Sequence, residues 1–286
     1  MNRKTQGILC ILSAAFFFAA MNAFVRAAGD LPSIQKSFFR NLVAVCFAAI
    51  ILVKNHVPPR VERKELPYLF MRAFCGTLGI LCNFYAVDHL LLSDASVLNK
   101  LSPFFAIIFS YFLLKEKIKP AQAIAVVMAF VGALCVVKPG FQNADLFAAV
   151  IGVMGGLTAG AAYTFVRILG THGVKGPVIV FWFSAFSCLV TLPYLIFQYT
   201  PMTGTQILCL LMAGLMAAGG QFSITAAYTY APAKEISIYD YSQVIFSAII
   251  GWIFFSQMPD ALSVLGYVII CAAFVWMFLY QKKHEL

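Results

Sequence analysis

Long uninterrupted runs of apolar residues are the feature that most constrains the fold of this chain. The runs are about 20 residues long, the length that an α-helix needs to cross a hydrocarbon core of roughly 30 Å. Hydrophobic residues make up 62% of the sequence and charged residues only 11%, whereas a soluble domain has roughly 25% charged residues. A soluble fold could not bury so much apolar surface. The pattern therefore predicts an all-α integral membrane protein.

Charged and turn-forming residues divide these runs into ten expected transmembrane helices. The first half gives helices at 5–28, 34–53, 67–87, 93–114 and 119–138. The second half gives helices at 145–170, 177–198, 205–230, 234–256 and 260–280. Most Lys and Arg residues lie in alternate connections, and the positive-inside rule then places both termini in the cytoplasm. We expect a multi-pass protein of the cell (plasma) membrane.

The two halves of the sequence are related by a shift of 141 positions. This shift aligns Phe24-Val25-Arg26 with Phe165-Val166-Arg167, and it also aligns Ser96 with Ser237. A single offset that relates two distant regions indicates a duplication, with residues 1–141 as the first five-helix repeat and residues 142–286 as the second. Because five is odd, the second repeat must enter the membrane from the opposite side. The sequence therefore predicts two inverted five-helix repeats.

Two of the expected helices carry stripes of polar residues. In the helix at 234–256, Ser237, Asp240 and Gln243 recur at a spacing of three and share one face. In the helix at 93–114, Asn99 and Lys100 lie on a similar stripe, and the shift of 141 aligns Asn99 with Asp240. Polar stripes in apolar helices indicate a cavity that contains water. We place the centre of the pathway between these two helices.

Other expected helices also carry buried polar residues, which either contact a solute or form interhelical hydrogen bonds worth roughly 0.6–2 kcal/mol. Asn22 and Tyr163 are related by the shift of 141, and Gln221, Thr225 and Tyr228 follow one face of a single helix. The full set of predicted substrate-binding residues is Asn22, Asn83, Asn99, Lys100, Tyr163, Gln221, Thr225, Tyr228, Ser237, Asp240 and Gln243.

An ionisable side chain at the centre of a membrane helix costs roughly 2.5–3.5 kcal/mol, so each one needs a partner or a wet cavity. Asp240 is our candidate for proton coupling, and Lys100 is its candidate partner. With a rise of about 1.5 Å per residue, the two are expected about 10 Å apart along the membrane normal. We expect a solute or water between them, although a direct ion pair stays open. The alternative role of such a pair is to hold two helices together.

Three further arginines lie near the ends of expected helices. We expect Arg72, Arg26 and Arg167 to extend their charged groups to the membrane surface, whereas Arg40 is a candidate for a buried polar role. Pro103 lacks a backbone donor and can bend the helix at 93–114. The bend either exposes carbonyls to a cavity or only fits the packing.

Several short motifs carry a resemblance to a known family. They are Ser37-Phe38-Phe39-Arg40-Asn41, Arg72, Ala95-Ser96-Val97-Leu98, Ser102-Pro103-Phe104 and Leu114-Lys115-Glu116-Lys117. Their order and spacing resemble the EamA-type ten-helix members of the drug/metabolite transporter superfamily over nearly the whole chain. The resemblance implies a solute carrier with a central cavity, lined by helices of both repeats, that works by alternating access.

The predicted function is that of a secondary transporter that exports a small polar or amphipathic metabolite, such as an amino acid or a derivative, with proton coupling or exchange. An uptake carrier or exchanger is the alternative. An intramembrane enzyme would need a catalytic constellation at membrane depth that the sequence lacks, and a channel would need rings of repeated charge. We expect no cofactor, no metal and no nucleic acid as partner, only a small-molecule substrate and the lipid bilayer. The oligomeric state stays open.

Overall fold

The computed structural model describes residues 2–115, 120–137, 143–256 and 260–283, and this part of the chain is helical without strands. The first half comprises α1 (Arg3–Ala27), α2 (Ser33–Lys54), the 3-10 helix η1 (Arg63–Glu65), α3 (Leu66–His89), α4 (Leu92–Asn99), α5 (Ser102–Leu114) and α6 (Pro120–Val137). The second half comprises α7 (Asn143–Thr171), α8 (Gly176–Gln198), α9 (Gly204–Tyr230), α10 (Ala233–Ile236), the 3-10 helix η2 (Ser237–Tyr241), α11 (Ser242–Phe255) and α12 (Ala261–Lys283).

The expectation of a helical membrane protein is confirmed. Within the described residues, seven helical segments are long and apolar enough to cross a membrane, among them the stretch Asp94–Leu114 that joins α4 and α5. Shorter apolar helical segments lie at Ala123–Gly132 in α6 and Val264–Ala273 in α12. A total of ten crossings stays a prediction.

The helices expected at 93–114 and 234–256 are both interrupted, and in this respect the prediction of continuous helices is wrong. In the first, α4 ends at Asn99 and α5 begins at Ser102, with a proline in its first turn. A proline has no backbone donor and is favoured at a helix start. In the second, the residues from Ser237 to Tyr241 form a 3-10 helix before α11 begins. The polar stripe through Asp240 therefore does not follow one continuous α-helix.

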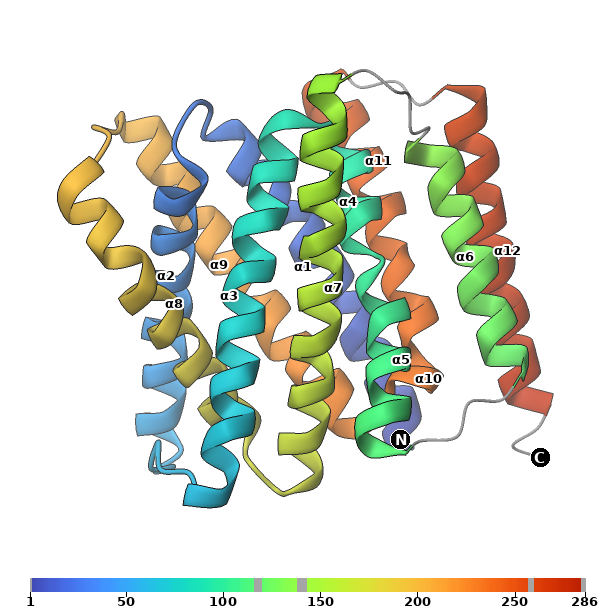
Figure 1. The fold of residues 1–286 in the computed structure, drawn as a ribbon, viewed down its shortest axis with the longest axis horizontal. Coiled ribbons are helices and arrows are strands. Elements are labelled where there is room, and N and C mark those ends of the chain that lie inside the picture. The colour runs from blue at the N-terminus through green and yellow to red at the C-terminus, as the bar shows by residue number, and fades with distance from the viewer. Residues whose placement is uncertain (1, 116–119, 138–142, 257–259, 284–286) are drawn as a thin grey trace.

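The helices pack as a bundle in which partners come from opposite halves of the chain (Figure 1). Helix α1 packs along α9, α3 along α7, α2 along α8, and α6 along α12 at one edge of the bundle. A glycine stripe on α7 faces the junction of α4 and α5: a Cβ added at Gly156 would lie 2.6 Å from the carbonyl oxygen of Leu98. Small residues there allow the close helix approach that is common in membrane proteins.

The first helices of the two halves run in opposite directions (Figure 1). Helix α1 begins at the lower edge of the bundle, where α12 also ends, whereas α7 begins at the upper edge (Figure 1). The chain also leaves α5 and α11 in the same unusual way, because Lys115 (φ 54°) and Ser256 (φ 53°) both adopt the left-handed conformation. Non-glycine residues rarely have positive φ, and these two lie 141 positions apart.

Candidate functional site

A small polar cavity lies at the centre of the bundle, where helices of both halves meet. Its volume is about 50 Å³, which is room for water but well below the roughly 300–1,000 Å³ of a typical ligand pocket. The predicted binding residues that line it are Asn22, Asn83, Asn99, Tyr163, Gln221 and Gln243. Apolar residues complete the wall, among them Phe18, Met21, Ile80 and Phe183. The lining is therefore amphipathic.

The amide side chains around this central cavity leave polar atoms without a protein partner. Asn83 Nδ2 donates to Asn22 Oδ1 at 3.2 Å, which joins α3 to α1. Asn22 Nδ2, Asn83 Oδ1 and Gln243 Oε1 are buried and make no hydrogen bond to the protein. A buried polar group without a partner costs about 1–3 kcal/mol. These atoms are thus available to a ligand or to water.

Two arginines, Arg40 on α2 and Arg72 on α3, also line the central cavity, and we call them the cavity arginines. Each is about 1% exposed. Arg40 Nη1 donates to Asn41 Oδ1 at 2.5 Å, and Arg72 Nη2 donates to Gln221 Oε1 at 2.9 Å. The expectation that Arg72 reaches the membrane surface is wrong, because α8 and α9 cover it.

The cavity arginines flank one aromatic ring and lack an acidic partner. The Cζ atoms of Arg40 and Arg72 lie 5.8 Å and 4.1 Å from the ring centroid of Phe183. In the described part of the chain, neither forms an ion pair, and the Nε atom of each has no hydrogen-bond acceptor. Buried charges are normally paired, so this site carries positive charge that the protein leaves unbalanced.

Two further predicted binding residues, Thr225 and Tyr228, lie outside the cavity wall. Tyr228 is fully buried and its ring stacks on that of Tyr163, with centroids 5.0 Å apart and planes at 15°. Tyr228 therefore supports a residue of the cavity wall rather than forming part of that wall. Thr225 is also buried and does not line the cavity. The side chain of Ser237 lies outside the described residues.

Lys100 and Asp240 form a direct ion pair beside the cavity. Lys100 Nζ lies 2.8 Å from Asp240 Oδ1, and neither side chain has exposed surface. The expectation of about 10 Å between them, with solute or water interposed, assumed straight helices and is wrong. Both residues lie at helix interruptions, Lys100 at the C-cap of α4 and Asp240 just before α11. These helix ends favour a cation and an anion respectively.

The ion pair is incompletely satisfied. Neither oxygen of the Asp240 carboxylate accepts a hydrogen bond of good geometry. The ammonium group of Lys100 likewise donates none. A neutral contact joins the same two helices nearby, where Ser96 Oγ and Ser247 Oγ lie 2.8 Å apart. Because Ser96 also donates to the carbonyl of Leu92 at 2.8 Å, the hydroxyl of Ser247 is the donor between the two serines.

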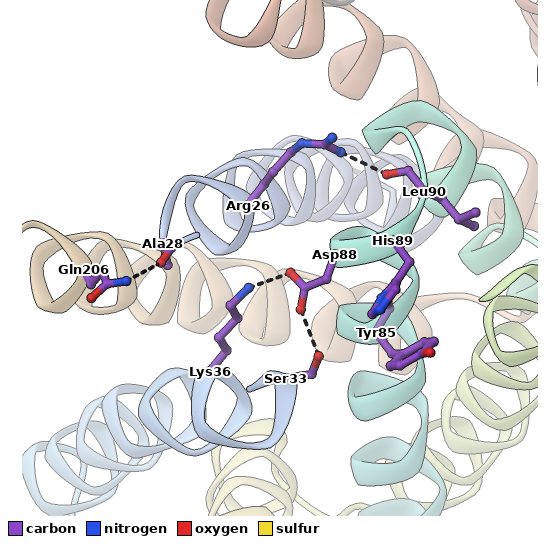
Figure 2. Close-up of polar contacts among 9 residues, drawn as sticks. All are labelled: Arg26, Ala28, Ser33, Lys36, Tyr85, Asp88, His89, Leu90 and Gln206. Carbon is purple, nitrogen blue, oxygen red and sulfur yellow. Dashed lines mark hydrogen bonds and ion pairs between the residues drawn. The ribbon is translucent and has the colours of Figure 1, made fainter. Parts of the chain in front are cut away.

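A polar cluster connects α1, α2 and α3 at the upper end of the bundle (Figure 2). Lys36 Nζ lies 2.5 Å from Asp88 Oδ1, and Ser33 donates to Asp88 Oδ2 at 2.8 Å. Arg26 Nη1 donates to the carbonyl of Leu90 at 2.9 Å. Lys36 is only 1% exposed, whereas Asp88 is 19% exposed, so this upper cluster (Arg26, Ser33, Lys36 and Asp88) is partly buried between the helix ends.

The opposite end has its own polar contacts, which we call the lower cluster (Glu65, Arg167 and His172). His172 Nδ1 lies 2.7 Å from Glu65 Oε2. Arg167 Nη1 donates to the carbonyls of Tyr228 and Thr229 at 3.4 Å and 3.3 Å. Arg26 and Arg167, which the shift of 141 aligns, thus bind carbonyls at the ends of α3 and α9. The expectation that both also extend to the membrane surface stays a prediction.

Some of these functional residues carry a signal in the sequence and others do not. An arginine in an apolar run is such a signal for both cavity arginines, although depth along one helix could not show what covers Arg72. Lys36 and Asp88 are 52 residues apart, lie at expected helix ends and have no spacing that links them.

Among the described residues, no group of three His, Cys, Asp or Glu side chains is placed to hold a metal ion.

Comparison with known proteins identifies relatives over almost the whole chain. The model of the EamA-like transporter family matches twice, at residues 5–138 and 146–279. The pseudopaline exporter CntI of Pseudomonas aeruginosa is 34% identical over 272 residues, which cover 94% of each chain. The riboflavin transporter of Vibrio cholerae is 26% identical and covers 97% of this chain and 94% of its own.

A human relative and a solved structure match a similar share of this chain. The human solute carrier family 35 member G1 is 26% identical over 93% of this chain and 77% of its own. A solved crystal structure covers 99% of both chains with a TM-score of 0.81 and 13% sequence identity. At that identity the likeness shows the fold alone.

Proposed function

Since this chain belongs to the EamA-like transporter family and is a membrane transporter rather than an enzyme, we propose that it exports a small polar or amphipathic metabolite by alternating access. The observation that carries the proposal is the central cavity, which helices of both halves of the chain line. An exporter of 34% identity supports the direction. An amino acid or a derivative fits the amide-rich, partly aromatic wall.

The architecture we propose is ten crossings in two inverted repeats, residues 1–141 and 142–286. The opposite directions of α1 and α7 support it, as do the exchanged packing partners, since α1 with α9 corresponds to α7 with α3. The left-handed residues Lys115 and Ser256 are a further correspondence. Inverted repeats are recurrent in secondary transporters, with the substrate site at their interface.

Alternating access would use the two polar clusters as gates. In a pathway through the central cavity, opening one end requires the upper cluster to separate, and opening the other requires the lower cluster to separate. Arg26 and Arg167 correspond between the repeats, so the same kind of contact closes each end.

Proton coupling through Asp240 is the finer part of the proposal. Its carboxylate is buried, lies at a helix interruption and has a cation as its only close partner among the described residues. Discontinuous helices commonly carry the coupling-ion sites of transporters. Protonation would neutralise Asp240, release Lys100 and so loosen the contact between α4 and α11.

The membrane and the orientation complete the proposal: the cell membrane, with both termini in the cytoplasm. Basic residues concentrate on the side of the termini, as the positive-inside rule requires. A cysteine added after Leu286 should resist an impermeant label applied to intact cells. Labelling of that cysteine without permeabilisation would exclude this orientation.

Proteoliposomes test the transport mechanism. A metabolite screen by thermal shift first identifies a substrate, since a ligand at 100 times its Kd adds roughly 2.7 kcal/mol of stability. Wild-type protein should then concentrate that substrate against its gradient when a pH gradient is imposed. The Asp240→Asn variant should exchange substrate without concentrating it. If that variant folds poorly, the double variant that adds Lys100→Met should behave in the same way. Undiminished pH-driven accumulation in both would reject the coupling role, and accumulation only into right-side-out vesicles would favour an uptake carrier.

A further inference from the structure

We infer that the substrate is a net-anionic metabolite with two carboxylate groups, one for each cavity arginine; the inference rests on the proposed transport through the central cavity. Arg40 and Arg72 are the starting point. Both guanidinium groups line the cavity, both are almost completely buried, and neither has an acidic partner in the described part of the chain. A buried guanidinium without a counter-ion is costly, so the bound state should supply the missing negative charge.

The positive charge at the site is not cancelled by a nearby acid. Among the described acidic residues, Asp240 lies beside the cavity, and its charge is already balanced by Lys100 at 2.8 Å. Asp88 is likewise engaged by Lys36 at the upper end. Arg40 and Arg72 therefore leave the site with an excess of two positive charges, which a dicarboxylate would balance.

The geometry suits two separate carboxylates on one molecule. The two Cζ atoms lie 5.8 Å and 4.1 Å from the same ring centroid, so they can be no more than about 10 Å apart. Each arginine retains an unbonded Nε, and guanidinium groups bind carboxylates through paired N–H donors. A short dicarboxylate can span such a distance, with its carbon chain against Phe183.

The neutral polar atoms add a second requirement. Asn83 Oδ1 and Gln243 Oε1 are buried acceptors without donors, and both residues line the cavity. They would accept a hydrogen bond from an amine or hydroxyl group of the ligand. An acidic amino acid or an amino dicarboxylate derivative has both features.

Binding to purified protein tests the charge class with defined probes. The probes are succinate, glutarate and adipate, each with its monoamide and its diamide, and the readout is the apparent Kd from thermal shift. For at least one chain length, the dicarboxylate should bind about 10-fold or more tightly than its monoamide, since a charged hydrogen bond is lost. Arg40→Gln and Arg72→Gln should each abolish that preference. Lys64→Gln, which removes an exposed surface cation, is the matched control and should keep it.

Each alternative result overturns the inference. Equal binding of dicarboxylates and diamides would show that charge is not recognised, and so would a preference that survives in both arginine variants. If none of the three dicarboxylates binds, the inferred dicarboxylate site is also excluded. Counterflow in proteoliposomes separates this inference from the proposed function: a neutral or cationic solute that exchanges while dicarboxylates fail to bind leaves transport intact. Dicarboxylates that bind without being exchanged would support the inferred binding site and would contradict the proposed transport through it.

Discussion

Separating the buried ion pair should destabilise the protein more than any neutral contact between the same helices. Lys100 and Asp240 are fully buried and 2.8 Å apart, so either single substitution leaves a charge without a counter-ion. Such a loss typically costs about 3–5 kcal/mol, whereas replacing both partners is often nearly neutral. Asp240→Asn and Lys100→Met should therefore each lower the free energy of unfolding by about 3 kcal/mol or more. The double variant should lose about 1 kcal/mol or less.

The chain contains a matched control for this double-mutant cycle. Ser96 and Ser247 join the same helices, α4 and α11, at the same distance of 2.8 Å, and both are fully buried. Neutral interhelical hydrogen bonds in membrane proteins have coupling energies that average about 0.6 kcal/mol and reach about 1.7 kcal/mol. The Ser96→Ala and Ser247→Ala cycle should fall in that range.

Unfolding in mixed micelles, titrated with sodium dodecyl sulfate, measures all the variants on one scale. The coupling energy of the charged pair should exceed that of the serine pair by at least about 2 kcal/mol, from the difference between the two ranges. A coupling energy for Lys100 and Asp240 no larger than that of the serines would mean that the ion pair is not closed in the resting protein. The interpretation of this ion pair as a contact that holds the two helix interruptions together would then lose its basis.

Three further outcomes are expected. Asp88→Asn should raise hydrogen–deuterium exchange in residues 86–92 and leave exchange in residues 168–175 unchanged, and Glu65→Gln should do the reverse. The reason is that each substitution removes one contact of one cluster. A change in exchange at both ends in either variant would contradict independent gates. Gly156→Ala should destabilise the protein by about 1–3 kcal/mol, since the added Cβ would lie 2.6 Å from the carbonyl oxygen of Leu98. Gly204→Ala should be tolerated, because a Cβ there would have no neighbour within 4 Å. Equal effects of the two substitutions would refute the packing argument. Arg40→Met should raise the free energy of unfolding of the ligand-free protein by about 1 kcal/mol, and a loss of stability would indicate a structural role.

The sequence predicted the helical membrane class, the family and six of the sixteen residues that line the cavity, because these depend on properties of single helices. An apolar run of about 20 residues is a span regardless of its neighbours, and a polar residue such as Asn22 or Gln221 inside it has few alternatives to facing the interior. Polar residues within apolar runs therefore gave a useful, though incomplete, list of the wall.

The wrong predictions concern side chains whose position depends on how two helices pack or on an interruption within one helix. Arg72 was placed by its distance from the helix end, which says nothing of Phe183 and Gln221 that cover it. Lys100 and Asp240 were separated by a calculation that assumed a constant rise per residue, but each lies where the α-helix is interrupted. The pairing of Lys36 with Asp88 needs the antiparallel arrangement of α2 and α3, which no local pattern encodes.

The internal symmetry of the chain separates the parts that move from the parts that select. Arg26 and Arg167 correspond at the shift of 141 and bind carbonyls near the ends of α3 and α9, so in the proposed mechanism the same kind of contact would close either end. A transporter needs this balance, because two states that differ by only a few kcal/mol can both be populated. The cavity arginines do not recur: the shift of 141 places Phe181 and Ala213 at the corresponding positions. A residue that served only the gating scaffold would be expected in both repeats. In the proposed mechanism, these unmatched charges would therefore be where the scaffold distinguishes one solute from another.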